Sequence, residues 1–367
     1  MKILYDHQAF SMQLYGGISR YFSELMNQFI NFSDIEFKIA CKYCSNSYLN
    51  SNIRAYTFPK KISCIDKLYG RLNKCKSLNE EYSLSQLRLG DFDVFHPTYY
   101  DNYFIDHFNG KPFVTTVHDM IHELFFEMFN DSKIVLQKKK LIEHSDAIIA
   151  VSHNTKNDIL KLFDDVDESK IYVIHHGYPD NTNLLKTDEK GNSNYLLFVG
   201  NRERYKNFFF FIFSMRAIIK ELPWLNIQCI GGGKFSVNEL KLIDILGMTG
   251  RIFQCDVSED QIGNYYSNAL ALVYPSLYEG FGMPILEAFA FNCPVLCSDC
   301  SSLPEVAGDA AVFFNPKSIK SIQEAVKLLT HNEDTRMELI NKGNRRLMDF
   351  NWKKTAKLTK NVYRSVF

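Results

Sequence analysis

Short apolar runs alternate with amphipathic segments along the whole chain. Runs such as residues 2–5, 195–199 and 270–274 are nearly continuous in apolar side chains, which is typical of buried parallel strands. Between such runs, apolar side chains recur at helical spacing, as in Ile18, Tyr21, Phe22, Leu25 and Phe29. Strands that alternate with helices predict an α/β fold built on parallel, doubly wound sheets.

The runs fall into two groups that a polar stretch separates. The further predicted strands cover residues 93–96, 112–117, 146–151, 171–174, 227–230 and 311–314. Residues 179–194 lie between the groups and are rich in turn formers, which indicates a linker. We therefore expect a first domain over residues 1–178, a second over residues 195–350, and a last helix over residues 351–367.

Composition agrees with a two-domain globular protein and limits its partners. The chain has 367 residues, of which 46% are hydrophobic and 23% charged, and its formal net charge is zero. A balanced charge gives no indication of nucleic-acid binding. The start, MKILYDHQAF, does not resemble a secretory signal, and no apolar stretch approaches 18 residues, so we expect a cytoplasmic protein.

Cysteines do not suggest a metal site. The nine cysteines form no pair of zinc-type CxxC motifs, and reduced thiols are expected in the cytoplasm. Cys293, Cys297 and Cys300 lie close together in the sequence, but buried small hydrophobic side chains explain them better than metal ligands do.

One segment is basic and amphipathic. Residues 59–76 hold six Lys or Arg against one Asp, with apolar side chains at helical intervals. Such a segment fits either an ordinary solvated helix face or a helix lying on a membrane surface.

The most informative stretch is residues 273–305, where a strand, a glycine loop and a helix follow one another. Gly282 precedes Pro284, which suits the first position of a helix, and Glu279 and Glu287 stand on either side of this helix start. Helix N-termini bind anions such as phosphate. The two carboxylates could hold hydroxyl groups on both sides of a bound diphosphate, although a pair of surface glutamates at a loop is the simpler interpretation.

Polar residues also follow other predicted strands, and each of them has both a ligand-binding and a purely structural interpretation. Arg202 and Lys206 follow the strand 195–199 and could neutralise a diphosphate, but such residues are often only solvated. His118 ends the strand 112–117, where ligands of open α/β sheets bind, but it could be a core residue. His118 and His122 have the spacing of zinc ligands, but Asp119 stands where HExxH has its glutamate, so the pattern does not favour a metalloprotease. The glycines at 231–233 and the pair at 16–17 permit close backbone approach or simple turns.

The pattern from Glu279 to Glu287, with GFGMPIL between them and then PV and SSLPEV, resembles the Glu-x7-Glu signature of retaining family-4 glycosyltransferases. VGNRERYKNF and VSHNTKNDI are similar to further segments of that family, and the likeness extends through nearly the whole chain. The resemblance implies a GT-B fold, with two Rossmann-like doubly wound domains facing a cleft and a C-terminal helix that crosses back to the first domain.

The resemblance also assigns roles to residues. Glu279 would contact the transferred sugar, Glu287 the ribose, and Arg202 and Lys206 the leaving diphosphate, while His118 would contact the donor sugar. Further residues would line the donor or acceptor site, namely Gly16, Gly17, Gly232, Val257, Phe281, Gly282 and Met283. No metal or other cofactor is implied, and no protein base is assigned.

The implied reaction is transfer of a sugar from a nucleoside diphosphate to a hydroxyl group of a glycan or lipid-linked acceptor, as in the synthesis of O-antigen, capsule or another surface polysaccharide. GDP-mannose is the first candidate donor and a UDP-sugar the second. Relatives that act on lipid-linked acceptors favour peripheral contact of residues 59–76 with the inner membrane leaflet. The alternatives are a glycoside hydrolase that uses Glu279 and Glu287, and a non-catalytic protein that binds nucleotide sugars.

Overall fold

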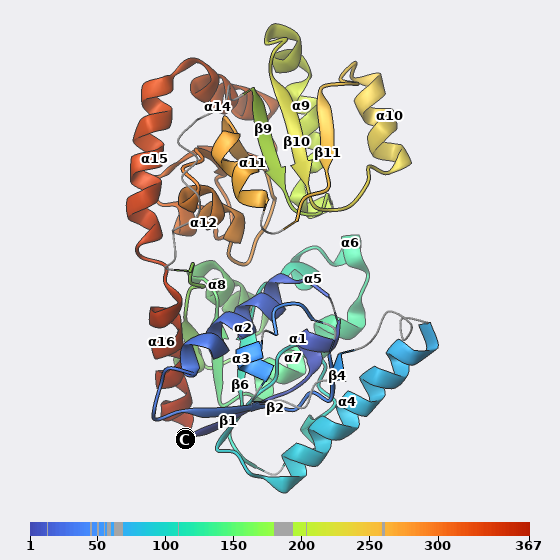
Figure 1. The fold of residues 1–367 in the computed structure, drawn as a ribbon, viewed down its shortest axis with the longest axis vertical. Helices are drawn as coiled ribbons and strands as arrows, with labels where there is room; N and C mark the ends of the chain where they lie inside the picture. Colours follow the sequence, from blue (N-terminus) through green and yellow to red (C-terminus); the bar gives the residue numbers. More distant parts are fainter. Residues whose placement is uncertain are drawn as a thin grey trace. The chain divides into compact units, whose positions relative to one another are not determined.

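The chain folds into two compact units, which are described separately. The computed structural model describes residues 1–12, 14–44, 46–49, 51–54, 56, 60–61, 69–108, 110–179, 194–202, 204–258 and 261–367. Unit 1 comprises residues 1–177 together with 352–367, and unit 2 comprises residues 178–351 (Figure 1).

Unit 1 is built on parallel strands. They are β1 (Lys2–Tyr5), β2 (Glu36–Ile39), β3 (Tyr43–Cys44), β4 (Lys60–Lys61), β5 (Val94–His96), β6 (Val114–Val117), β7 (Ala147–Ala150) and β8 (Ile171–Val173). The orders are β2-β1-β5 and β6-β7-β8, and a parallel bridge between Phe95 and Phe113 connects the two groups. β3 and β4 form a separate pair. β2 lies on one side of β1 and β5 on the other, so the strand order reverses at β1.

Helices of unit 1 connect these strands. They are α1 (Gln8–Met12), α2 (Gly17–Phe29), α3 (Ser51–Arg54), α4 (Tyr69–Leu89), α5 (Ile121–Leu124), α6 (Phe126–Phe129), α7 (Ser132–His144), α8 (His153–Leu162) and α16 (Trp352–Val366), with short 3-10 turns η2 (Ile105–His107) and η3 (Glu168–Lys170). Ser152 caps α8 by accepting a hydrogen bond from the Thr155 N–H, and Ser is a preferred residue at this position.

The last helix, α16, completes the core of unit 1, although it is separated in sequence from the rest. It packs against α2 and contributes buried side chains to the cluster around β1. The Tyr363 hydroxyl lies 2.8 Å from the Tyr5 hydroxyl and 2.6 Å from His96 Nδ1, and all three side chains are buried. In a buried network of this kind, removing one member leaves the polar groups of its partners without hydrogen bonds, which is costly in the protein interior.

Unit 2 has a single parallel sheet with the order β11-β10-β9-β12-β13-β14. Its strands are β9 (Tyr195–Val199), β10 (Asn226–Ile230), β11 (Ile252–Cys255), β12 (Ala271–Tyr274), β13 (Val295–Ser298) and β14 (Ala311–Phe314). This is the 3-2-1-4-5-6 order of dinucleotide-binding folds, in which ligands bind beyond the carboxyl ends of the strands where the order reverses. In unit 2 that place lies between β9 and β12.

Helices of unit 2 cover the sheet. They are α9 (Phe208–Glu221), α10 (Val237–Ile245), α11 (Ile262–Asn268), α12 (Met283–Ala290), α13 (Leu303–Ala307), α14 (Ile319–His331) and α15 (Glu333–Leu347), with a 3-10 turn η4 (Arg204–Lys206). α9 and α14 contribute one apolar cluster with β9, β10 and β12, and α15 packs against α12. α12 is thus held between the sheet and a second helix.

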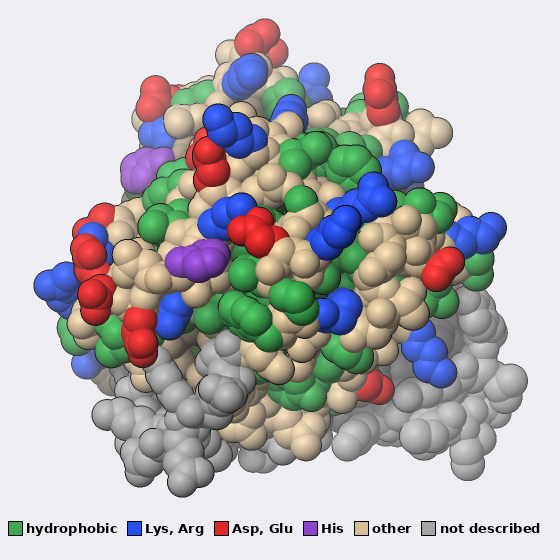
Figure 2. All heavy atoms as spheres, turned by 90° about the horizontal axis from the view of Figure 1, so that it is seen from above, with side chains coloured by type: hydrophobic (Ala, Val, Ile, Leu, Met, Phe, Trp, Pro, Cys, Tyr) green, Lys and Arg blue, Asp and Glu red, His purple; other side chains and the backbone are tan. Residues whose placement is uncertain are grey.

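The predicted linker 179–194 lies outside the described residues except for residues 179 and 194. Of the predicted basic segment 59–76, residues 60–61 belong to β4 and residues 69–76 to the start of α4, while residues 59 and 62–68 lie outside the described part of the chain. In the described part of the chain, no helix is long and apolar enough to span a bilayer. On the face shown in Figure 2, the coloured basic and acidic side chains are interspersed, in keeping with the balanced charge of the chain.

Candidate active site

The loops after β9 and β12 meet where the strand order of unit 2 reverses. Lys206 ends the 3-10 turn that follows β9, and Glu279 lies in the loop that follows β12. Lys206 Nζ is 2.7 Å from Glu279 Oε1, and the two side chains are only 12% and 10% exposed. The same ammonium group lies 3.4 Å from the Tyr274 hydroxyl. The structure therefore brings together two residues that are 73 positions apart and that the sequence predicted to act on one ligand.

The loop that bears Glu279 is fixed by two serines of the SSLPEV segment. The Glu279 N–H donates to Ser301 Oγ over 3.1 Å. The Ser302 hydroxyl is shared between the carbonyl groups of Glu279 and Phe281, at 2.9 and 2.8 Å. The Phe281 ring is buried against Phe350, with ring centroids 5.8 Å apart, so its side chain serves packing. The carboxylate of Glu279 thus projects from a rigid loop.

Helix α12 begins directly after this loop. Gly282 has φ +111°, a conformation that favours glycine, and a Cβ there would lie 3.0 Å from Leu303 Cδ2. Gly282 offers no side-chain cap, and the Ile285 N–H donates to the Gly282 carbonyl over 3.0 Å. Since Pro284 has no N–H, Met283 supplies the N–H group of this first turn that can bind an anion. Pro284, as predicted, lies at the start of the helix.

Glu287 lies one turn further along α12. The Tyr266 hydroxyl donates a hydrogen bond of 2.8 Å to Glu287 Oε2. Burial, reinforced by the charge of Glu287, raises the pKa of Tyr266 well above its ordinary value, so this phenol remains a donor. Nothing in the local sequence around Tyr266 indicates this role.

Arg202 is engaged by groups of the protein itself. Its guanidinium donates to Glu239 Oε1 over 2.5 Å and to the carbonyl groups of residues 231–234 over 2.6 to 3.2 Å. All three nitrogens are therefore engaged within the protein, and the residue is buried. The structure shows Arg202 supporting the glycine loop after β10, and a direct contact with the diphosphate remains a prediction.

That glycine loop is shaped by the close approach of Arg202. Gly232 has φ +71°, and a Cβ there would lie 2.9 Å from Arg202 Nη1, which leaves no room for a side chain. Glu239, the partner of Arg202, also belongs to a capping box with Ser236 at the start of α10. Val257 follows β11 and is half-buried. The predicted contacts of Gly232 and Val257 with a nucleotide base remain predictions.

His118, Gly16 and Gly17 belong to unit 1. His118 follows β6, and its Nε2 is buried without a hydrogen-bond partner in the described part of the chain. Burial lowers the pKa of His118 to about 3, so the ring is neutral. Gly16 caps α2 in an extended conformation, and a Cβ on Gly17 would meet nothing within 4 Å. The open Nε2 of His118 is compatible with its predicted contact with a ligand.

The cysteines near the site are free thiols. Cys293 and Cys297 are buried, as the sequence predicted. Burial, together with the charge of Asp299, raises the pKa of Cys300 to about 11. Within the described residues, no three His, Cys, Asp or Glu side chains gather as metal ligands.

Two family models together match residues 15–346. A model described as Glycosyl transferases group 1 matches residues 181–346, and one described as Glycosyltransferase Family 4 matches residues 15–181. The chain is a family-4-like glycosyltransferase with the GT-B fold. The boundary between the matched regions lies near residue 181, close to the division between units 1 and 2.

Relatives of this glycosyltransferase include enzymes of O-antigen synthesis. The chain is 33% identical over 190 residues to O-antigen chain mannosyltransferase RfbU of Salmonella typhimurium, and the match covers 52% of each chain. It is 26% identical over 265 residues to O-antigen chain mannosyltransferase B of Escherichia coli, covering 68% of this chain and 70% of the relative. The chain thus spans about half the length of the first relative.

Solved structures share the fold over the full length. Sucrose-phosphate synthase from Thermosynechococcus elongatus has a TM-score of 0.77 at 17% identity, covering 100% of this chain and 98% of that one. HepE of Anabaena, solved in complex with UDP and glucose, has a TM-score of 0.74 at 13% identity, covering 99% of both chains. At such identities the likeness establishes the GT-B fold, as the sequence predicted.

Proposed function

We propose that the chain transfers a sugar from a nucleoside-diphosphate sugar to a hydroxyl group of a glycan or lipid-linked acceptor. The observation on which this depends most is the ion pair of Lys206 and Glu279, which belong to the loops after β9 and β12, the second of which leads into the N-terminus of α12. An ammonium group and helix N–H groups attract a diphosphate. Glu279 and Glu287 lie on either side of this point and would bind the hydroxyl groups of the sugar and the ribose.

The proposed mechanism retains the anomeric configuration. As the bond to the diphosphate breaks, negative charge grows on the leaving group, and Lys206 with the first turn of α12 stabilises it. The leaving phosphate accepts the proton of the acceptor hydroxyl, so no protein base is assigned. His118 contacts the donor sugar as a neutral ring. We propose that these groups act without a metal ion.

The donor and acceptor are proposed from the relatives. Curated relatives are named mannosyltransferases of O-antigen synthesis, which supports mannose from GDP-mannose as the first candidate. The HepE structure contains UDP and glucose, which supports a UDP-sugar as the second. Synthesis of a surface polysaccharide at the cytoplasmic face of the inner membrane, with peripheral contact through residues 59–76, follows as the proposed setting.

A panel of nucleotide sugars tests the proposal. We expect one donor to raise the melting temperature of the protein and to be consumed in the presence of glycan or lipid-linked acceptors. Release of sugar from a simple glycoside without any nucleotide would favour a hydrolase instead. Stabilisation by a donor without hydrolysis or transfer to any acceptor would favour a non-catalytic binding protein.

A further inference from the structure

The guanidinium of Arg202 is surrounded by groups of unit 2. Its Nε donates to Glu239 Oε1 over 2.5 Å, and Nη1 donates to the Gly231 carbonyl over 2.6 Å. Nη2 donates to the carbonyls of residues 232–234 over 2.8 to 3.2 Å, and the guanidinium carbon lies 4.9 Å from the centre of the Phe235 ring. The side chain is only 4% exposed. These contacts leave little of the guanidinium, which has five N–H donors in all, for a ligand.

The loop after β10 takes its shape from this side chain. Gly231, Gly232 and Gly233 all have positive φ, at +89°, +71° and +67°, and the carbonyl groups of this left-handed turn converge on Arg202. A Cβ on Gly232 would lie 2.9 Å from Nη1, so glycine permits the close approach. Carbonyl oxygens that face one another repel, so the loop holds this shape only with a cation between them.

Glu239 fixes the guanidinium in turn. Its Oε1 accepts from Arg202, and its Oε2 accepts from the Ser236 N–H over 2.6 Å at the start of α10. Burial alone would raise the pKa of Glu239, but the hydrogen bonds from Ser236 and Arg202 outweigh burial and lower it, so the group is a carboxylate. Arg202, the glycine loop and the start of α10 therefore form one ion-paired unit that needs no ligand to hold it together.

The loop lies where the sheet order places a nucleoside. In the 3-2-1-4-5-6 order, β9 is strand 1 and β10 is strand 2. In dinucleotide-binding folds the phosphates bind after strand 1, whereas the ribose is held near the end of strand 2. Residues 231–234 follow β10 and are exposed, and within the described part of the chain their N–H groups donate no hydrogen bond. These donors are available to a ligand.

We propose that Arg202 is a positioning residue. Together with Glu239 it holds the loop 231–234 in the shape that receives the nucleoside of the donor, and it does not itself bind the diphosphate. This role replaces the direct contact that the family resemblance implies, because the charge of Arg202 is already compensated by Glu239 and the loop carbonyls. The inference rests on the proposed function, whose donor it concerns.

The variant Glu239→Gln separates the two roles, because they predict opposite results. Gln can still accept from the Ser236 N–H, but it turns an amide donor toward Nε of Arg202, so the loop loses its support. Positioning predicts weaker binding of nucleoside and nucleotide alike, by about tenfold if the loop keeps its binding shape only about a tenth of the time. A direct contact predicts tighter binding of the diphosphate, because the positive charge of Arg202 is released from its carboxylate.

The variant Arg202→Lys gives a second comparison. Lysine keeps the positive charge but lacks the planar fork that joins Glu239 to the loop. Binding of guanosine, GMP and GDP, and of uridine, UMP and UDP, is measured on the full chain by competition calorimetry. For the base that binds, the affinities for nucleoside and diphosphate should fall by the same factor, about tenfold, so their ratio remains that of the wild type. A loss confined to the diphosphate would show that Arg202 contacts phosphate and would overturn the proposal.

Arg251 provides the matched control. It also binds backbone carbonyls and one side chain, donating to Asn226 Oδ1 over 3.0 Å and to the Leu225 carbonyl. These contacts lie at the amino ends of β10 and β11, at the opposite edge of the sheet from the glycine loop. Arg251→Lys should lower the melting temperature and leave nucleotide binding unchanged. If it weakened binding as much as Arg202→Lys does, general destabilisation would account for both, and the positioning role would be refuted.

Failure of the transferase proposal is seen separately, in the wild type. A wild type that binds GDP or UDP but consumes no nucleotide sugar refutes the transfer alone, and the variants still decide the role of Arg202. A wild type that turns over donor, with tighter diphosphate binding in Glu239→Gln, refutes the positioning role alone. Absence of binding by all six probes refutes both. Melting temperatures establish that each variant folds.

Discussion

The ion pair of Lys206 and Glu279 combines a structural and a functional role, and a set of variants separates them. Removing one partner of a buried pair leaves the other charge without compensation, which typically costs about 3–5 kcal/mol. Since the two side chains stay 12% and 10% exposed, we expect Lys206→Met to lower the free energy of unfolding by the lower end of that range, about 3 kcal/mol. For a unit of this size, this free energy corresponds to a fall in melting temperature of about 6–12 °C.

Activity should fall for a second reason. Lys206 is proposed to stabilise charge that develops on the leaving diphosphate, and loss of one such contact typically reduces turnover by about 10²- to 10³-fold. The variant Glu279→Gln should destabilise unit 2 in the same way, because it leaves Lys206 as the buried charge. Both effects are measured by thermal unfolding and by transfer from the donor that the panel identifies.

The double variant Lys206→Met, Glu279→Gln decides between the roles. It contains no unpaired buried charge, so its melting temperature should return close to that of the wild type. Its activity should remain as low as that of the single variants. Lys327 and Glu221 provide the control, because they are also 2.7 Å apart but 43% and 49% exposed, and Lys327→Met should cost less than about 1 kcal/mol. Recovery of turnover together with stability would refute the proposed contact with the diphosphate.

Three further predictions follow from other parts of the structure. Burial lowers the pKa of His96 and His118 to about 3, so the unfolded chain takes up protons below pH 6.5 that the folded chain does not. The stability that these residues contribute is complete above that pH and is lost as the pH falls, by about 2 kcal/mol for each histidine between pH 7 and pH 5; urea unfolding at both values tests this, and a flat profile would contradict it. Tyr266→Phe removes a hydrogen bond to a site carboxylate and should raise the KM for the donor about tenfold with little change in kcat, whereas an unchanged KM would remove the tyrosine from the site. Gly343→Ala would place a Cβ 2.5 Å from Phe289 Cδ1 of α12, and this overpacking should cost about 1–3 kcal/mol in thermal unfolding, so a wild-type melting temperature would show that α12 and α15 can separate.

Much of the sheet could be predicted because parallel strands are buried on both faces. The runs Tyr195–Val199 and Ala311–Phe314 become β9 and β14 with the predicted bounds. The strand Val295–Ser298 was not predicted, because it is short and lies between a helix and a turn. Residues 319–347 form two helices, α14 and α15, because the Asn332 side chain caps a new helix by accepting from the Thr335 N–H. Asn is a strong capping residue, so this break was present in the sequence.

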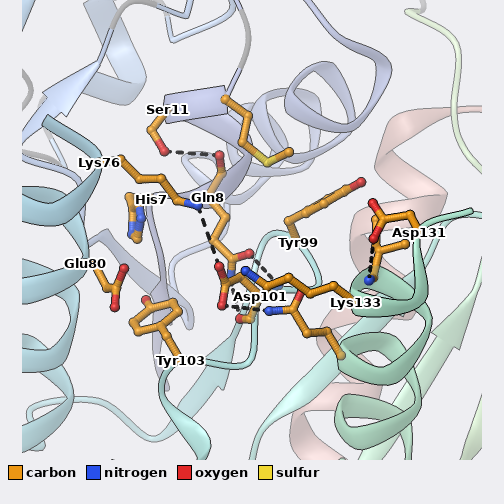
Figure 3. A pocket seen from close by; sticks show the side chains of 13 residues that line it. His7, Gln8, Ser11, Lys76, Glu80, Tyr99, Asp101, Tyr103, Asp131 and Lys133 are labelled. Atoms are coloured by element: carbon orange, nitrogen blue, oxygen red, sulfur yellow. Dashed lines mark hydrogen bonds and ion pairs between the residues drawn. The ribbon is translucent and has the colours of Figure 1, made fainter. Parts of the chain in front are cut away.

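The roles of individual side chains could be predicted only where a motif indicated them. Lys206 and Glu279 come from the family-like segments, and the structure places them in contact. Arg202 comes from the same segments, but its partner Glu239 lies 37 residues away, and no local pattern indicates which acceptor a buried guanidinium will find. A pocket of unit 1 is lined by residues of four separate segments, among them His7, Glu80, Asp101 and Lys133, which meet only after folding, so it could not be predicted from sequence spacing (Figure 3).

Helix α16 has a consequence for how the protein is made. Because Trp352–Phe367 belong to the same unit as β1, unit 2 is inserted in the sequence of unit 1 rather than following it. During translation, chains generally fold from the N-terminus onward. Here the core of unit 1 cannot be completed until residues 352–367 have left the ribosome, so unit 2 can fold while unit 1 is still incomplete.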